Sequence, residues 1–420
     1  MAVNPLLSGV RVLDLSRLLP GPFCSLYLAQ LGAEVIKIEE PNGGDYARES
    51  KELFAQVNRG KKSVTLDLRQ PGDVATFKEL VKTADVVLES FRPGVMDRLG
   101  CGYETLKQIN PKLVYAALTG YGHTGPYRDW AGHDLNYLAV AGVLEQFGSA
   151  GQAPQQLNLQ VADLAGGALT CAVGILAALI GARASGTGSF VDVSMTDGSA
   201  AMQVIALASL REHGKTFARG GDILSGALPN YAIYKCRDGK FIAVGALEPK
   251  FFKRLLQVVW GTAPAALRKL VPVGAAHSTG SGQASAATVG AKAPPTTATG
   301  KAQGKSSMNS FGDMGDKLRN PEKARRYLAP VRLALAALFR TRTRDYWTRL
   351  LAEQDACVTP VLMLSEALEN PQLRARGLIV DDQGKPAFGL PILFSDPPAP
   401  AGPSPGLGEH TEAVLGALKR

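Results

Sequence analysis

The chain has 420 residues, of which 45% are hydrophobic and 20% charged, as in an ordinary soluble globular protein with about two domains. Its net charge of +9 favours an anionic partner, but Lys and Arg are spread along the chain instead of clustered, which argues against nucleic acid. The five scattered cysteines contain no C-x-x-C pair, which argues against a disulfide framework or a zinc site and predicts a cytoplasmic location: Cys24, Cys101, Cys171, Cys236 and Cys357.

Strands and helices are predicted to alternate through the first 120 residues. A strand over Val10–Leu15 precedes the turn Pro20-Gly21-Pro22, a helix over Phe23–Leu31 and a strand over Glu34–Ile38. The alternation then continues with Ser63–Leu68 (strand), Asp73–Lys82 (helix), Ala84–Glu89 (strand), Tyr103–Ile109 (helix) and Leu113–Leu118 (strand). This order predicts an α/β fold whose large domain is a Rossmann-like, mostly parallel sheet with helices on both faces. Ligands of such sheets bind at the carboxyl ends of the strands.

The second half of the chain begins with a long apolar run. The segment Ala168–Ala182 is short for a membrane span, which needs about 20 residues, and predicts a buried helix. The N-terminus lacks a basic start followed by an apolar core, so we expect no signal peptide and no membrane partner. The later predicted elements are the strands Ser189–Ser194, Ala232–Lys235 and Lys240–Val244, a helix from Pro249, and helices at Arg332–Leu338 and Arg344–Leu351.

Residues 273–310 differ in composition from the rest of the chain. They contain no Leu, Ile, Phe, Trp or Tyr and no acidic residue, so they cannot bury enough apolar surface to offset the entropy of ordering. We therefore expect a flexible insertion. The predicted division is a large domain over 1–205, a smaller α+β domain over 206–330 that includes the insertion at 263–312, and a segment over 331–420 that returns to the large domain.

The turn after the first predicted strand argues against a nicotinamide enzyme. Glu39 follows the turn at a distance typical of a dinucleotide fold. The turn itself reads Leu18-Leu19-Pro20-Gly21-Pro22-Phe23-Cys24 and lacks the three glycines of G-x-G-x-x-G. The backbone therefore cannot wrap a pyrophosphate in the usual way.

Two polar groups stand out as candidates for proton transfer. Asp163 precedes Gly166-Gly167, and His133 lies between Gly132 and Asp134. A carboxylate and an imidazole are the groups that an enzyme uses to move a carbon-bound proton. Each also has a structural interpretation, because an Asp before a helix is a favoured N-cap and a lone His is more often structural than catalytic. Spacing alone leaves both interpretations open.

Several segments, in order along the chain, carry a family pattern. They are Leu7–Leu15 with Pro20-Gly21-Pro22, Leu31–Glu39 with Gly44-Asp45, Asn58–Ser63, Glu89–Val95, Gly120-Tyr121-Gly122 with Gly125-Pro126, Asp355–Val361 and Leu407–Thr411. Together they resemble the class III CoA-transferase family, in which alpha-methylacyl-CoA racemase is a branch. The resemblance covers nearly the whole chain except the insertion. It implies an enzyme of acyl-CoA thioesters with no metal and no permanently bound cofactor, coenzyme A being part of the substrate.

The resemblance also assigns roles. Asp163 matches the active-site aspartate, which is the covalent nucleophile of the transferases and an acid/base partner of a His in the racemase branch. Gly132–Tyr137 resembles the racemase motif and supplies that His as His133, whereas the formyl-CoA transferase pattern lacks it. The segment Ala243–Phe251 resembles the racemase segment whose Glu, here Glu248, hydrogen-bonds the catalytic His. Glu248 before Pro249 also fits the residue that precedes a helix.

These matches favour a racemase or epimerase of 2-methylacyl-CoA. His133 and Asp163 are expected on opposite faces of the α-carbon, with Glu248 orienting the imidazole and Tyr231 matching a racemase active-site tyrosine. Backbone N–H groups near Asp163-Leu164 and Gly166-Gly167 are expected to stabilise the thioester oxygen. The alternative is transfer of CoA between carboxylic acids with Asp163 as nucleophile. A non-catalytic CoA-binding protein is disfavoured because His133, Asp163 and Glu248 are all present.

The resemblance further implies a CoA cleft and an assembly. Arg92 suits bidentate phosphate binding, and Glu40 stands where many relatives carry an Arg that packs on the adenine, so Arg48 is expected to help there. The family architecture implies an interlocked homodimer in which Glu248 comes from the other subunit than His133 and Asp163. The positions that match the cleft of the family are Leu66, Arg69, Phe91 and Arg98.

Overall fold

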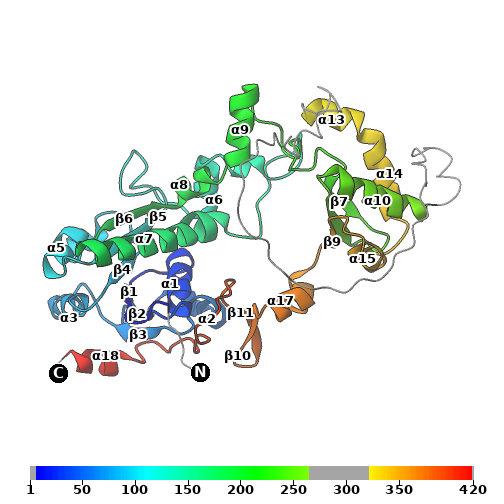
Figure 1. Ribbon diagram of the computed structural model, residues 1–420. Helices are drawn as coiled ribbons and strands as arrows, with labels where there is room; N and C mark the ends of the chain where they lie inside the picture. Colours follow the sequence, from blue (N-terminus) through cyan, green and yellow to red (C-terminus); the bar gives the residue numbers. More distant parts are fainter. Residues whose placement is uncertain (1–5, 264–320, 419–420) are drawn as a thin grey trace, which may run out of the picture. The chain divides into compact units, whose positions relative to one another are not determined.

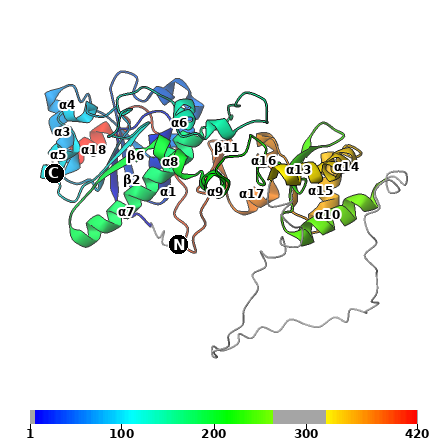
Figure 2. The ribbon, with the colours of Figure 1, turned by 90° about the horizontal axis from the view of Figure 1, so that it is seen from above.

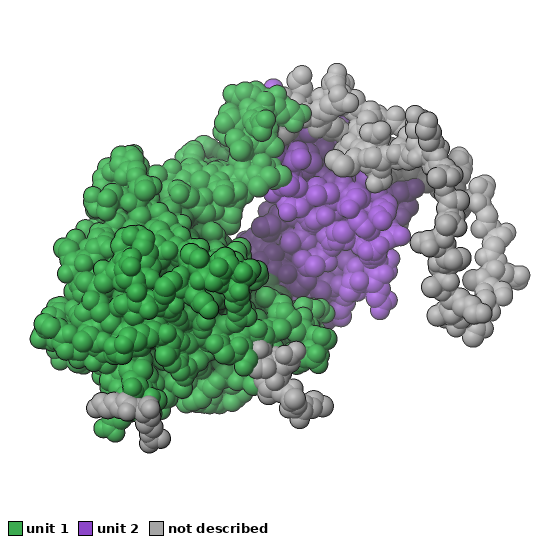
Figure 3. Space-filling model, turned by 60° about the vertical axis from the view of Figure 1, so that its left-hand side comes forward, with its two compact units in different colours: residues 1–219, 362–420 green, residues 220–361 purple. Residues whose placement is uncertain are grey.

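The computed structural model describes residues 6–263 and 321–418, which fall into two compact units (Figure 3). In its described part, unit 1 comprises residues up to Arg219 and from Leu362 onward, and unit 2 runs from Gly220 to Val361. The predicted domain boundaries were 205/206 and 330/331. Of the insertion predicted over 263–312, only residue 263 lies within the described residues.

A six-stranded parallel sheet forms the centre of unit 1 (Figure 1). The strand order is β3-β2-β1-β4-β5-β6, and every neighbouring pair is parallel. This confirms the predicted α/β class and parallel sheet. The order reverses between β1 and β4, which makes the carboxyl ends of these two strands the expected place for a ligand. The strands are β1 Arg11–Asp14, β2 Glu34–Glu39, β3 Lys62–Thr65, β4 Val86–Glu89, β5 Val114–Thr119 and β6 Phe190–Ser194.

Helices cover both faces of this sheet (Figure 2). One core contains α1 (Pro20–Gln30), the π-helix η3 (Ala162–Leu169) and α7 (Thr170–Ser185). The opposite core contains α3 (Pro71–Val81) and α5 (Tyr103–Ile109), with α18 (Thr411–Ala417) beside it. The remaining elements of unit 1 are η1 Tyr46–Glu49, α2 Lys51–Asn58, α4 Val95–Arg98, α6 Asp134–Val140, η2 Leu144–Gln146, α8 Met195–Ala201, α9 Val204–His213, α16 Leu364–Leu368, α17 Pro371–Ala375, and the hairpin of β10 Ile379–Asp382 with β11 Lys385–Phe388.

The apolar helix predicted over Ala168–Ala182 is only half buried. Its inner side, which includes Ile175, belongs to the core of unit 1, but Val173 is 68% and Ile180 72% exposed. The continuous helix Ala162–Ser185 has 24 residues and a mean hydropathy of 2.1, so by length and composition alone it is able to cross a membrane. Core helices of soluble proteins meet the same criterion, and the packing of the inner side on the sheet favours that interpretation.

Unit 2 is built on a three-stranded antiparallel sheet, β7-β8-β9. Trp347 fills the middle of its core and donates its indole N–H to the Phe339 carbonyl oxygen at 2.8 Å. Helices that follow the insertion therefore pack on this sheet, which is why unit 2 extends to Val361. The elements are β7 Tyr231–Lys235, β8 Phe241–Gly245, α10 Pro249–Gly261, α13 Pro321–Tyr327, α14 Ala329–Phe339, α15 Arg344–Ala352 and β9 Val358–Pro360.

Four fully buried charges lie near the carboxyl ends of β1 and β2. Lys61 Nζ is 3.1 Å from Asp14 Oδ2, and Lys37 Nζ is 2.8 Å from Asp45 Oδ2. Asp45 also accepts the N–H of Leu18 at 2.8 Å, and Leu18 has the left-handed φ of 62° that a side chain rarely adopts. The buried charge cluster of Asp14, Lys37, Asp45 and Lys61 therefore holds the turn that follows β1.

Candidate active site

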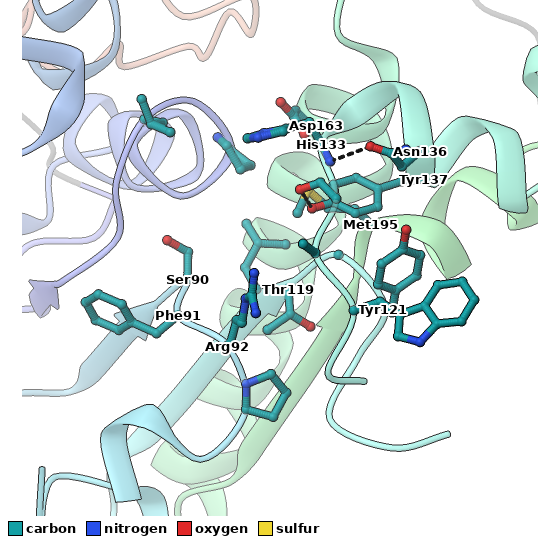
Figure 4. A pocket seen from close by; sticks show the side chains of 18 of the residues that line it. Ser90, Phe91, Arg92, Thr119, Tyr121, His133, Asn136, Tyr137, Asp163 and Met195 are labelled. Atoms are coloured by element: carbon teal, nitrogen blue, oxygen red, sulfur yellow. Dashed lines mark hydrogen bonds between the residues drawn. The ribbon is translucent and has the colours of Figure 1, made fainter. Parts of the chain in front are cut away.

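A cavity of about 470 Å³ opens in unit 1 at the point where the strand order reverses (Figure 4). Three of its walls are turns at the carboxyl ends of strands: 17–20 after β1, 90–93 after β4 and 119–121 after β5. Residues from 128–137, Asp163 near the start of η3 and Met195 of α8 complete the lining. The cavity therefore lies where an open α/β sheet is expected to bind its ligand.

His133 and Asp163 both line this cavity, so the fold brings the two predicted groups together (Figure 4). His133 immediately precedes α6, and its backbone N–H donates to Asn136 Oδ1 at 3.1 Å. Asp134, the first residue of α6, accepts the backbone N–H of Asp163 at 3.0 Å. This bond ties the segment that carries His133 to the segment that carries Asp163.

The surroundings of Asp163 favour its protonated form. Burial, and to a smaller extent the negative charge of the neighbouring Asp134, raise the pKa of Asp163 to about 7. A group with a pKa near neutral pH is able both to accept and to return a proton. The N-cap interpretation of Asp163 is wrong, because the residue that precedes η3 is Val161 and Asp163 lies within the first turn.

The glycines that follow Asp163 serve helix packing. A Cβ at Gly198 of α8 would lie 1.9 Å from the Gly166 carbonyl oxygen, so η3 and α8 approach too closely for any side chain. Gly166 and Gly167 are buried there and do not line the cavity. The N–H of Leu164 donates to the Gln160 carbonyl oxygen at 3.0 Å. The backbone N–H groups of this segment were expected to donate to the thioester oxygen. The structure instead shows the Leu164 N–H in a helix hydrogen bond and the two glycines in a helix contact.

Aromatic side chains that the sequence analysis did not single out form one wall of the cavity, with Tyr121, Trp130 and Tyr137 in the lining and Tyr127 packed behind them. The rings of Tyr127 and Trp130 stack with centroids 3.9 Å apart, and Tyr121 meets both edge-on. Tyr137 continues this aromatic wall and donates its hydroxyl to the Gly132 carbonyl oxygen; burial raises the pKa of its phenol. The four rings between Tyr121 and Tyr137 were the available signal in the sequence.

Cationic side chains contribute to another part of the lining. Arg17, Arg92 and Arg128 all line the cavity. The Arg17 guanidinium lies 5.2 Å from the Phe91 ring centroid, and Phe91 is itself a lining residue. Arginines suit phosphate oxygens because their N–H groups form paired hydrogen bonds. Phe91 and Arg92 were predicted for this role, whereas Arg17 and Arg128 were not.

The other predicted cleft residues lie elsewhere in unit 1. Leu66 is 4% exposed and packs in the core, and Arg98 ends α4 outside the cavity lining. Arg69 is exposed and pairs with Asp67, with 2.8 Å between Nε and Oδ1. Arg69 also lies 3.7 Å from Glu40, the residue that stands in place of an adenine-packing Arg. A role of these three residues in CoA binding stays a prediction.

Arg48 is already occupied by a neighbour. Both ends of its guanidinium donate to the Glu39 carboxylate at 2.7 Å, and its Cζ lies 3.8 Å from the Phe54 ring centroid. Glu39 in turn accepts the hydroxyl of Ser63 at 2.6 Å. Arg48 and Glu39 thus serve the fold, which removes the expected help of Arg48 at the adenine.

Glu248 and Tyr231 belong to unit 2. Glu248 is exposed and precedes α10, where its carbonyl oxygen accepts the N–H of Phe251 at 3.0 Å. Tyr231 lines a cavity of about 720 Å³ that also contains Ile233 and Cys357. Their pairing with His133 and Asp163 stays a prediction. Within the described ranges, no group of three or more His, Cys, Asp or Glu side chains is arranged to hold a metal ion.

Comparison with known proteins agrees with this architecture. The model of CoA-transferase family III matches residues 7–284 and 298–411. The chain is 34% identical to alpha-methylacyl-CoA racemase of Homo sapiens, over 97% of this chain and 92% of the relative. It is 31% identical to acetyl-CoA:oxalate CoA-transferase of Acetobacter aceti, over 97% and 94%. The crystal structure of a CAIB/BAIF family protein from Brucella suis superposes with a TM-score of 0.76 and 28% identity, covering 98% of this chain and 99% of that one. A family model that matches nearly the whole chain, together with the shared fold, establishes that the protein belongs to CoA-transferase family III and is an enzyme of that family that acts on CoA thioesters.

Proposed function

We propose that this enzyme racemises or epimerises 2-methylacyl-CoA thioesters by removing and returning the α-proton. The observation that carries the proposal is that His133 and Asp163 line one cavity, with the pKa of Asp163 raised to about 7. The likeness to a racemase at 34% identity supports it. A carboxyl with a pKa near 7 is suited to exchange protons near neutral pH.

In the proposed reaction, one group removes the α-proton and the other delivers a proton to the opposite face. The thioester acidifies its α-carbon, and the enolate that forms needs stabilisation in a cavity with little water. Asp163 in its ionised form accepts the proton while protonated His133 donates, and the roles exchange for the other enantiomer. After one turnover in this direction Asp163 is protonated and His133 is neutral, which is the starting state for the other enantiomer.

Placement of the CoA moiety follows from charge. CoA carries a pyrophosphate and a 3′-phosphate, and Arg17, Arg92 and Arg128 supply cationic groups in the cavity lining. The aromatic wall between Tyr121 and Tyr137 then remains for the acyl part. Apolar rings are suited to an acyl chain because contact removes both surfaces from water.

We further propose a homodimer in which Glu248 of one subunit orients His133 of the other. Two exposed apolar helix faces support an assembly. Val173 and Ile180 of α7 are 68% and 72% exposed, and Val204 and Leu207 of α9 are 67% and 55% exposed. Large contiguous apolar patches are rare on monomers, so a second copy is the natural cover.

The alternative function is CoA transfer between carboxylic acids with Asp163 as nucleophile. It is favoured by the 31% identity to an acetyl-CoA:oxalate CoA-transferase over nearly the whole chain. In that reaction the Asp163 carboxylate attacks the thioester carbonyl, the C–S bond breaks, and a mixed anhydride forms with release of the CoA thiolate, which then attacks the Asp163 carbonyl and frees the first acid. His133 has no required part in that step, which makes the two functions separable.

Deuterium incorporation tests the proposal directly. The enzyme is incubated with a single enantiomer of a 2-methylacyl-CoA in deuterated water without any acceptor acid, and the α-position is followed by mass spectrometry and chiral analysis. We expect deuterium at the α-carbon together with loss of enantiomeric purity. Absence of exchange, combined with CoA movement that requires an added acid, would overturn the racemase proposal in favour of the transferase.

Substitution of His133 by alanine provides the second test. Loss of one acid/base partner is expected to lower the exchange rate by about 10²–10⁴-fold. A transferase that uses Asp163 alone would keep most of its activity in the same variant. Thermal unfolding of the variant controls for misfolding. We expect the variant to fold, because the backbone N–H of residue 133, and not its side chain, donates to Asn136 Oδ1.

Trp130 is expected to report acyl-CoA binding. It is 53% exposed at the cavity, whereas Trp347 is fully buried in unit 2. Addition of an acyl-CoA should change the tryptophan emission, and the change should vanish in Trp130→Phe. An undiminished change in that variant would show that the aromatic wall is not the binding surface.

A further inference from the structure

Glu89, the last residue of β4, is a buried carboxyl that the proposed reaction does not use. Its side chain is 3% exposed and borders a second cavity of about 210 Å³ beside the candidate active site. His123 and Tyr115 also line this second cavity. The loop that follows Glu89, residues 90–93, is a wall of the first cavity. Glu89 therefore stands between the two cavities at the base of that loop.

The contacts of Glu89 link it to the loop. Glu89 Oε2 accepts the backbone N–H of Phe91 at 2.6 Å, and Glu89 Oε1 lies 3.8 Å from Nε2 of His123. That nitrogen is buried and has no hydrogen-bond partner in the described part of the chain. The Phe91 N–H bond fixes the backbone that carries the Phe91 ring and the Arg92 guanidinium, both of which belong to the cavity lining.

We propose that Glu89 is a positioning residue for CoA binding: its carboxyl holds the backbone of Phe91 and Arg92 in the conformation that receives the anionic part of the thioester. This inference rests on the proposed function, because it takes the larger cavity to hold the CoA moiety. A buried backbone N–H that loses its acceptor is costly. Removal of the carboxyl is thus expected to release the loop.

The protonation of Glu89 gives the inference a distinctive pH signature. Burial raises the pKa of Glu89 to about 8, with added repulsion from Asp97 and Asp192. Below that pH the carboxyl is neutral and does not repel the phosphates of a bound CoA. Above about pH 8, the negative charge of the ionised carboxylate repels the phosphates, so an anionic ligand binds less tightly. By linkage, the loss of affinity accompanies ionisation of Glu89 as the pH rises through about 8.

Several other titratable groups surround Glu89, on the elements packed against it. They are Asp97 on α4, Tyr103 and Glu104 on α5, Tyr115 on β5, His123 in the following loop and Asp192 on β6. Burial lowers the pKa of His123 and raises that of Tyr115, which moves both transitions away from the transition of Glu89. Glu104 is 75% exposed and pairs with Lys107, which makes Glu104→Gln a matched control.

Acetyl-CoA binding to the full chain, measured by titration calorimetry between about pH 6.5 and 9, tests the proposal. The wild-type protein should lose about three- to tenfold in affinity relative to Glu89→Gln as the pH rises through 8, because the amide accepts the same N–H but never ionises. Glu89→Ala should bind about tenfold more weakly at every pH. Glu104→Gln should follow the wild type. Taking the ratio of the acetyl-CoA affinities of wild type and Glu89→Gln at each pH removes the effect of the titration of the ligand itself.

Each outcome decides the question. A constant ratio between wild type and Glu89→Gln across the pH range, or a folded Glu89→Ala that binds like the wild type, would overturn the inference. If Glu89→Ala does not fold, the Glu89→Gln ratio still decides. No binding of acetyl-CoA at any pH would instead refute the proposed site for CoA. Normal binding and α-proton exchange with a constant ratio would refute only the role of Glu89.

Discussion

Replacing Asp163 by asparagine is expected to lower the rate of α-proton exchange by about 10²–10⁴-fold while leaving acyl-CoA binding within a few-fold of wild type. The amide has nearly the shape of the carboxyl but neither accepts nor returns a proton. Its backbone N–H still donates to Asp134, so the start of η3 keeps its position. The measurement is deuterium incorporation at saturating substrate, together with a direct binding titration.

The same substitution, which lowers activity, is expected to raise the free energy of unfolding, because the pKa of Asp163 differs between the folded and unfolded states. The pKa of Asp163 is raised from 3.8 in the unfolded chain to about 7 in the fold. The folded state therefore favours the protonated carboxyl, and that stabilisation is lost as the pH rises through about 7. Above neutral pH the wild type carries the cost of a half-buried carboxylate, which the asparagine variant avoids.

We therefore expect Asp163→Asn to be more stable than the wild type by about 1–3 kcal/mol above pH 8 and close to it near pH 4. Urea unfolding at the two pH values measures the difference. Loss of activity combined with a gain in stability would mark Asp163 as a group kept for chemistry at the expense of the fold. A variant that is less stable than the wild type at high pH would contradict the raised pKa.

Much of unit 1 was predictable because its strands are short, apolar and separated by turn residues. The helix Tyr103–Ile109 has the predicted bounds, and each of the six strands lies within two residues of its prediction at either end except where β3 ends early, at Thr65. Apolar runs mark these strands because a parallel sheet covered on both faces buries its central strands, as β4 and β5 are buried here, although β6 is partly exposed. The local sequence pattern does not predict the boundaries of the two units, because helices that follow the insertion, such as α15, pack on a sheet whose strands β7 and β8 precede it.

The candidate site was predicted less evenly, for a physical reason. His133 and Asp163 line one cavity because Asp134 accepts the N–H of Asp163 at a sequence separation of 29, a contact that no sequence spacing reveals. The sequence pattern singled out those two residues as candidates, and the family resemblance assigned their roles. Leu66, in contrast, is in the core, since a motif match fixes the place of a residue on the backbone but not the direction of its side chain.

The buried charge cluster leads to the largest stability prediction. Asp14 and Lys61 have side chains with no exposed surface, and Lys61 has further acceptors at Pro22 and Asn58, 2.9 Å and 2.8 Å away. Asp14→Ala is expected to lower the free energy of unfolding by about 3–5 kcal/mol, because it leaves the Lys61 ammonium buried without its counter-charge. Urea unfolding near pH 7 measures this loss.

Two comparisons identify charge as the cause. Asp67 pairs with Arg69 at the surface, so Asp67→Ala should cost less than about 1 kcal/mol. The double variant Asp14→Leu with Lys61→Met should recover much of the loss, because it removes both charges and keeps apolar volume. A double variant as unstable as Asp14→Ala alone would show that shape and hydrogen bonds, and not the unpaired charge, control the stability.

The pH dependence of the wild type adds an independent check on the same cluster. Although burial alone would raise it, Lys61 and Lys37 hold the pKa of Asp14 at about 2, below the ordinary 3.8. The contribution of Asp14 is therefore complete above about pH 4 and is lost as the pH falls toward 2. The acid sensitivity of the wild type should decrease in the double variant.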